Sequence, residues 1–357
     1  MARQYQEFSH VRDDHPDDCA VWVSAEFLGR CLGILTRWTY KNMATIIGAV
    51  DHNDDTLALS KSLKRLTDGD DQVVILGIAP RLSNEITDHK VVSSAKRAEQ
   101  ALLNALTEKT ENLSQTVGQA CDVDLVSGPI AQKIIETTIL RKADLVVKED
   151  DHLSASSKGR IGNVARTLLK RSPSTTLILR KPIEILTPRI VIAIDNPENK
   201  LEGAERSLLN ARVFKSGIEM AKRLDAVEVT LLHIWTMPDL KFLQHPRSGL
   251  SEEGVNQHIA KAKAVTSKWF NAFRQEAEAK YAPEGLSFRT KLVLGEGGKV
   301  LAEAADELRP DLLVIGSANR RGVQSLFFGN TAEDVLNWAN CNLLVVKPVD
   351  FYDMVSA

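Results

Sequence analysis

The chain has 357 residues, of which 43% are hydrophobic and 26% are charged, and its formal net charge is −2. At the usual size of roughly 100–200 residues per domain this length predicts two domains, and the composition is that of an ordinary folded protein. The near-zero charge and the lack of a basic run argue against nucleic-acid binding, and no apolar stretch is long enough to insert into a membrane.

The cysteines and histidines show no metal-site or disulfide pattern. Cys19, Cys31, Cys121 and Cys341 include no Cys-x-x-Cys pair. The eight histidines lack metal-ligand spacing, and His233, inside an apolar run, is better explained as a core residue. The N-terminal stretch carries acidic residues where a signal peptide would have a basic start and an apolar core. We therefore expect a cytoplasmic protein that needs no metal.

In the first half, short apolar runs alternate with helical patterns. The expected strands are residues 44–51, 72–79, 122–128, 143–148 and 175–180. Helical patterns lie after the first strand, at about 92–116, from Pro129 onwards and near 163–170. Strands that alternate with helices in this way predict a parallel sheet covered on both faces.

The same order of elements begins again in the second half. The expected strands are residues 189–195, 227–235, 286–295, 311–316 and 342–347, and the longer helices are residues 202–223, 252–280 and 298–308. Asp144 and Asp311 each stand eighteen residues before a glycine, Gly162 and Gly329, without a gap. This internal repeat predicts two tandem α/β domains.

We expect five segments along the chain, which are an N-terminal extension with an amphipathic helix at 1–41, a domain at 42–182, a linker at 183–188, a domain at 189–348 and a tail at 349–357. The last strands of the two domains would leave open edges if they stayed unpaired. We therefore predict that Leu177 and Ile178 lie against Leu344 and Val345 in an intramolecular pseudo-dimer. A further homodimer stays open.

Two loops of the second half have a composition that suits phosphate. In open parallel sheets, ligands collect at the carboxyl ends of the strands. The sequence there reads Gly-Ser-Ala-Asn-Arg-Arg-Gly at 316–322 and Gly-Asn-Thr at 329–331, and the second run opens a helix. Glycines let a phosphate approach the backbone, and the N–H groups of a helix start, with the hydroxyl of Thr331, would bind its oxygens.

With these loops, residues 189–348 resemble the universal stress protein family. Its nucleotide-binding members carry Gly-x-x-Gly, nine residues and Gly-[Ser/Thr], with an aspartate after the first strand that contacts adenosine. The resemblance implies a site made by Asp195, Ile234, Gly316, Ser317, Asn319, Gly329, Asn330 and Thr331. Asn319 replaces a glycine and Asn330 replaces a hydroxyl residue, so we expect ATP or AMP to bind weakly.

The first half, about 42–182, resembles the same family less closely. Its phosphate-loop positions are Glu149 and His152, with Asp150 and Asp151 between them, and carboxylates there would repel a phosphate. We expect no nucleotide in this half. Asp51 ends its first strand as Asp195 does in the second half, and either aspartate could instead cap the following helix. The tandem arrangement, over roughly 300 residues, is most similar to the bacterial E-type members of the family.

The resemblance implies a Rossmann-type, adenine-nucleotide α-hydrolase-like fold and a non-enzymatic stress-response protein that binds a nucleotide or another small ligand and acts through protein partners. Two alternatives stay open, a nucleotide-free scaffold or apolar-ligand-binding protein and a slow ATP hydrolase. Enzymes of this superfamily need a Ser-Gly-Gly-x-Asp-Ser loop, where this chain has DHNDD and DNPEN, and neither a Walker motif nor a nucleophile elbow is present.

Overall fold

The computed structural model describes residues 44–80, 89–150, 162–196, 203–317, 334–335 and 337–348. These residues belong to one compact unit that begins at Asn42. The expected N-terminal amphipathic helix and the C-terminal tail lie outside the described residues.

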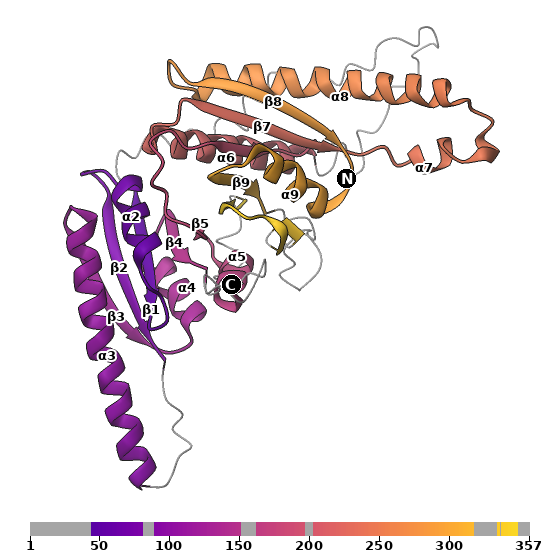
Figure 1. Cartoon of the computed structure of the whole chain (residues 1–357). Coiled ribbons are helices and arrows are strands. Elements are labelled where there is room, and N and C mark those ends of the chain that lie inside the picture. The colour runs from indigo at the N-terminus through magenta and orange to yellow at the C-terminus, as the bar shows by residue number, and fades with distance from the viewer. Residues whose placement is uncertain are drawn as a thin grey trace, which may run out of the picture. The chain divides into compact units, whose positions relative to one another are not determined.

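The first half contains the strands and helices that the sequence predicts, in the predicted order (Figure 1). Its strands are β1 (Thr45–Asp51), β2 (Gln72–Ala79), β3 (Cys121–Ser127), β4 (Leu145–Glu149) and β5 (Thr175–Leu179). Its helices are α2 (Leu57–Leu66), α3 (His89–Val117), α4 (Ile130–Arg141) and α5 (Asn163–Arg171). Strands β1 and β2 read as continuous apolar runs because nearly every residue in them is buried under helices on both faces.

The second half repeats this order of strands and long helices as far as β9. Its strands are β6 (Ile190–Ala193), β7 (Glu228–Trp235), β8 (Ser287–Leu294), β9 (Leu312–Gly316) and β10 (Asn342–Val346). Its long helices are α6 (Gly203–Arg223), α8 (Glu252–Tyr281) and α9 (Gly297–Leu308). The segment between β7 and α8 adds a short helix, α7 (Leu240–Leu243), and a 3₁₀ turn (Pro246–Ser248) that the sequence did not predict, because single turns carry too little periodicity.

All ten strands form one sheet, in the order β3-β2-β1-β4-β5-β10-β9-β6-β7-β8. Neighbouring strands are parallel except β5 and β10, which pair antiparallel. In that pair Leu343 lies opposite Ile178 and Leu344 lies opposite Leu177. The predicted fold class and the pairing of the two last strands are therefore confirmed, and the order of the first five strands is mirrored in the second five.

The repeated aspartates have a structural role at the amino edge of the sheet. Asp144 Oδ2 accepts the Thr45 N–H at 2.9 Å, and Asp311 Oδ2 accepts the Arg189 N–H at 2.9 Å. Each bond joins the same two strands of its half, β1 to β4 and β6 to β9. The two halves can therefore be matched residue by residue from these contacts, without reference to any relative.

Side chains also connect the two halves across the antiparallel pair. Asn342 Oδ1 accepts the backbone N–H groups of Arg180 and Lys181 at 2.8 and 3.1 Å. The Lys347 ammonium, at the end of β10, donates to the Leu169 carbonyl of α5. Away from the sheet, Arg223 of α6 pairs with Asp71, which precedes β2.

Candidate functional site

The strand order reverses between β6 and β9, where an open α/β sheet binds its ligands. Asp195 follows β6 by two residues, Gly316 ends β9, and Ile234 is the penultimate residue of β7. Because these parallel strands are neighbours, the structure brings Asp195, Gly316 and Ser317 to the same carboxyl edge, with Ile234 on the next strand.

Asp195 is held by a side chain that the sequence did not single out. Asn210 of α6 is buried, its Oδ1 accepts the Asp195 N–H at 3.1 Å, and its Nδ2 donates to the Asp195 carbonyl at 2.5 Å. This amide pair fixes the backbone of an exposed aspartate at the edge of the sheet. The sequence does contain a signal for Asn210, since it is a polar residue between Leu209 and Val213, two buried residues of the apolar stripe of α6.

The end of β9 packs closely against α6. A Cβ added at Gly316 would lie 3.0 Å from carbon atoms of both Leu209 and Val213, which is tighter than ordinary van der Waals contact. The neighbouring Ser317 is buried, and its N–H donates to the Val346 carbonyl at 2.9 Å. The Ser317 N–H is therefore already bonded to β10. Position 316 is a glycine because a larger side chain would collide with α6.

Successive residues of β7 face opposite sides of the sheet. Ile234 is partly buried, pairs with Val293 of β8, and packs against the core cluster that includes Leu301 and Ala305 of α9. His233 is buried on the other face, where its Nδ1 lies 2.9 Å from the Ile194 carbonyl oxygen. Its ring centroid lies 5.2 Å from that of Trp269. His233 is thus a core residue, as predicted, and no group of three metal-binding side chains occurs among the described residues.

Four residues of the predicted site, Asn319, Gly329, Asn330 and Thr331, lie outside the described residues, and so does the predicted phosphate loop. The part of the second site that the structure places is therefore the edge formed by Asp195, Ile234, Gly316 and Ser317.

The matching edge of the first half contains a buried charge cluster. When Asp144 is matched with Asp311, and Thr45 with Arg189, the strands of the two halves align. In this alignment Asp51 corresponds to Asp195, Glu149 to Gly316 and Asp150 to Ser317. Asp51 is buried, unlike Asp195. The fully buried Lys148 Nζ lies 2.7 Å from Asp54 Oδ1 and 3.3 Å from Asp51 Oδ2.

Glu149 is the last residue of β4, although the sequence placed it in a loop. Its Oε1 accepts the Leu59 N–H at 2.7 Å and its Oε2 accepts the Thr56 N–H at 3.3 Å, so that it caps α2, whose N-cap residue Thr56 makes no side-chain cap. Burial raises the pKa of Glu149 and also that of Asp54, where the nearby Lys148 opposes the rise.

Asp150 is also buried and bonded. Its Oδ1 accepts the Gly162 N–H at 2.9 Å, and its Oδ2 lies 3.3 Å from Arg180 Nε. The sequence treated Glu149 and Asp150 as loop carboxylates that repel phosphate. In the structure both carboxylates are buried and bonded to helix starts, and Asp150 also pairs with Arg180. Asp151 and His152 lie outside the described residues.

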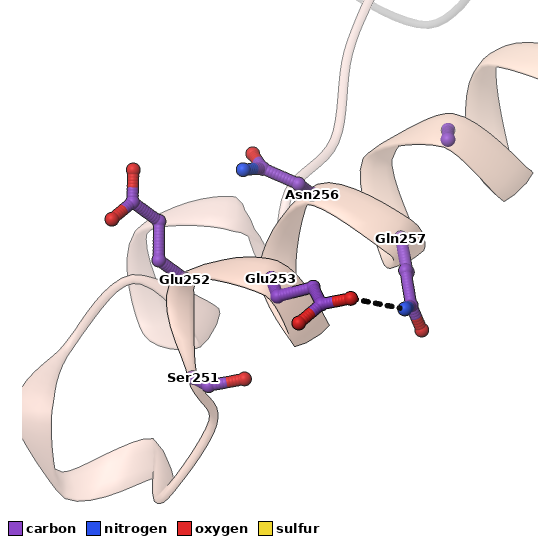
Figure 2. Close-up of a pocket in the computed structure, with 6 residues that line it drawn as sticks. Ser251, Glu252, Glu253, Asn256 and Gln257 are labelled. Carbon is purple, nitrogen blue, oxygen red and sulfur yellow. Dashed lines mark hydrogen bonds between the residues drawn. The ribbon is translucent and has the colours of Figure 1, made fainter.

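Two open hollows on the described surface contain none of the predicted site residues. One lies at the start of α8 (Figure 2), where Ser251 Oγ accepts the Gly254 N–H at 3.1 Å and Gln257 donates to Glu253 at 3.5 Å. The other lies beside the edge strand β3, between Val123, Leu125 and Leu140. Neither brings together groups that suggest a reaction. None of the helices in the described ranges has the length and apolar character needed to cross a membrane.

Comparisons with known proteins agree with this architecture. The profile of the universal stress protein family matches residues 43–180 and again 187–347. "Universal stress protein E" of Escherichia coli K12 is 25% identical over 226 residues, which are 61% of this chain and 65% of the relative. The chain thus spans slightly less than two thirds of the length of that curated relative.

Two crystal structures are similar in fold. One, a chain from Pseudomonas aeruginosa UCBPP-PA14, has a TM-score of 0.60 at 18% identity and covers 87% of this chain and 96% of its own. The other, a universal stress protein from Archaeoglobus fulgidus DSM 4304, has a TM-score of 0.52 at 14% identity and covers 85% and 98%. At these identities the likeness concerns the fold alone.

Proposed function

The chain belongs to the universal stress protein family, and we propose that it is a non-enzymatic, cytoplasmic stress-response protein that binds ATP or AMP in its second half and acts through protein partners. The observation that carries the proposal is the meeting of Asp195 and Gly316 at the point where the strand order reverses. The matching position in the first half is filled by side chains.

The described edge carries groups that suit an adenosine. A carboxylate such as that of Asp195 accepts hydrogen bonds from ribose hydroxyls, and Asn210 fixes its backbone in place. Ile234, which is partly buried, offers an apolar side chain for a base. The adenosine would therefore lie across the ends of β6, β7 and β9.

The phosphates would be bound by the loop residues, Asn319 and the helix start at Gly329, Asn330 and Thr331. Backbone N–H groups at a helix start suit phosphate oxygens. At position 319 an asparagine is larger than the glycine of the family motif, and Asn330 lacks a hydroxyl. Together these changes cost about 1–3 kcal/mol, or roughly 5- to 150-fold in affinity, so the binding is weak.

Calorimetry with ATP and AMP tests this site. We expect weak heats of binding for the wild type, no binding for Gly329→Glu, which fills the helix start, and at least tenfold weaker binding for Asp195→Asn, roughly one lost hydrogen bond to a charged group. Asp239→Asn is the matched control, because Asp239 is an exposed aspartate at the start of α7, and it should bind as the wild type does.

Equal heats for the wild type and Gly329→Glu would show that the nucleotide site is elsewhere. Phosphate analysis of the same samples tests the non-enzymatic assignment. We expect ATP to stay intact over the titration, and release of phosphate that Gly329→Glu abolishes would instead identify a slow hydrolase.

A further inference from the structure

We propose that Asp150 is a built-in anion, whose carboxylate permanently occupies an anion site formed in the first half by the start of α5 and the guanidinium of Arg180. The site holds a side chain of the chain itself in place of a free ligand. This inference concerns only the first half, and it does not depend on nucleotide binding in the second.

The start of α5 lacks a local cap. Its N-cap residue is Gly162, which has no side chain and therefore cannot cap the first turn itself. Asp150, twelve residues earlier in the sequence, accepts the N–H of this N-cap residue at 2.9 Å. A negative charge at this position is also favoured by the helix dipole.

Arg180 supplies a second, independent group at the same carboxylate. Its Nε lies 3.3 Å from Asp150 Oδ2, and the two side chains are 15% and 4% exposed. One carboxylate oxygen thus contacts a helix-start amide and the other a guanidinium, the combination of donors that binds phosphate and sulfate. The Asp150 N–H bonds to the Leu179 carbonyl at 2.8 Å, which fixes the backbone that carries this charge.

The neighbouring residue, Glu149, likewise caps the start of the other helix at this edge. Glu149 accepts the N–H groups of Thr56 and Leu59 at the start of α2. Two adjacent acidic residues at the end of β4 therefore satisfy two helix starts. Arg180 also donates to the Ala339 carbonyl just before β10, so the built-in anion orients a side chain that contacts the second half.

Rescue by inorganic phosphate tests the proposal. Asp150→Ser removes the carboxylate and leaves space beside Gly162 and Arg180, and we expect its thermal midpoint to fall by about 5 °C in sodium chloride. Millimolar inorganic phosphate at matched ionic strength should recover about half of that loss, because a free anion can enter the emptied site. The wild type should gain clearly less, because Asp150 already occupies this site.

Asp144→Ser is the matched control, because Asp144 also accepts one backbone N–H but at the amino edge of the sheet. Equal effects of phosphate on both variants, or no effect on Asp150→Ser, would overturn the proposal. If Asp150→Ser does not fold in either salt, Asp150→Asn decides, since it keeps the shape and loses only the charge. The thermal midpoint of Asp150→Asn should be clearly lower than that of Asp144→Asn. Equal thermal midpoints would contradict a role for the charge of Asp150.

Discussion

At the scale of single residues, the two halves differ most in which charged groups they bury. The first half places Asp51, Asp54, Lys148 and Glu149 together out of water at the carboxyl edge of its sheet. The second half keeps Asp195 exposed at the same position, and Asn210 bonds to its backbone. A buried charge cluster whose members pair with one another resists rearrangement, whereas an exposed carboxylate can be reached from solvent.

Lys347 gives a prediction about pH. Burial lowers the pKa of Lys347 to about 7, well below its usual value. Between that value and about 10.4, the unfolded chain binds a proton at this lysine and the folded chain does not, so the free energy of unfolding should rise with pH. We expect a rise of about 3 kcal/mol between pH values of about 7 and 10.

The measurement is urea unfolding of the wild type and Lys347→Met across this pH range. The variant should lose most of the rise. Lys181→Met is the control, because Lys181 follows β5 as Lys347 follows β10, but it is 44% exposed and paired with Asp311 at 3.0 Å. A rise that survives in Lys347→Met would show that other groups cause it.

At the scale of helices and strands, most of the fold could be predicted because the same pattern of apolar strands and polar residues occurs in both halves. Buried parallel strands read as apolar runs, and the two aspartates that join strands at the amino edge recur at the same distance from a glycine. The site was less predictable. Asn210 acts through a contact 15 residues away, and Glu149 and Asp150 find their partners on other helices. A polar residue such as Asn210 in an apolar stripe is visible in the sequence, but its partner is not, because a long-range contact leaves no local signal.

Close packing of α6 on β6 depends on Gly217. A Cβ at this position would lie 2.3 Å from Ile192 Cδ1 and 2.7 Å from its Cγ1. Gly217→Ala should therefore lower the free energy of unfolding by about 1–3 kcal/mol, because the buried Ile192 has no room to move. Chemical denaturation is the measurement.

The control for Gly217→Ala is Gly69→Ala, since no atom lies within 4 Å of a Cβ at Gly69. Its stability should match or slightly exceed that of the wild type, because alanine restricts the unfolded chain. If the two alanine variants were equally stable, α6 would not pack on β6 as closely as described.

At the scale of the whole molecule, the antiparallel pairing of β5 with β10 turns two five-stranded sheets into one. The two last strands thereby cover edges that would otherwise stay open. Side chains reinforce the contact from both directions, Lys347 on the Leu169 carbonyl and Arg180 on the Ala339 carbonyl. The repeat in the sequence is therefore the reason for an intramolecular pseudo-dimer, and a homodimer or other protein partner would use other surfaces.

The pair formed by Arg223 and Asp71 predicts how acid affects the contact between the halves. Burial alone would raise the pKa of Asp71, but hydrogen bonds from Arg223 and from the N–H groups of Asp68 and Ala44 hold that pKa below its usual value. A lowered carboxyl pKa stabilises the fold above the unfolded value of about 3.9 and loses that contribution as the pH falls through the folded value.

Asp71→Asn should therefore lower the free energy of unfolding by about 1–3 kcal/mol at neutral pH. The difference from the wild type should shrink as the pH falls below about 4. Denaturant unfolding at several pH values measures both quantities. A difference that stays constant down to acid pH would mean that the amide disturbs packing and that the charge is not the cause.

The central claim is that one half binds nucleotide at its carboxyl edge while the other is closed by its own side chains. Titration of the isotope-labelled protein with ATP, followed by amide NMR shifts, tests it even for weak binding. We expect shifts at Asp195, Ile234 and Gly316, and none at the matching residues Asp51 and Glu149. Equal shifts in both halves, or shifts in the first half alone, would contradict it.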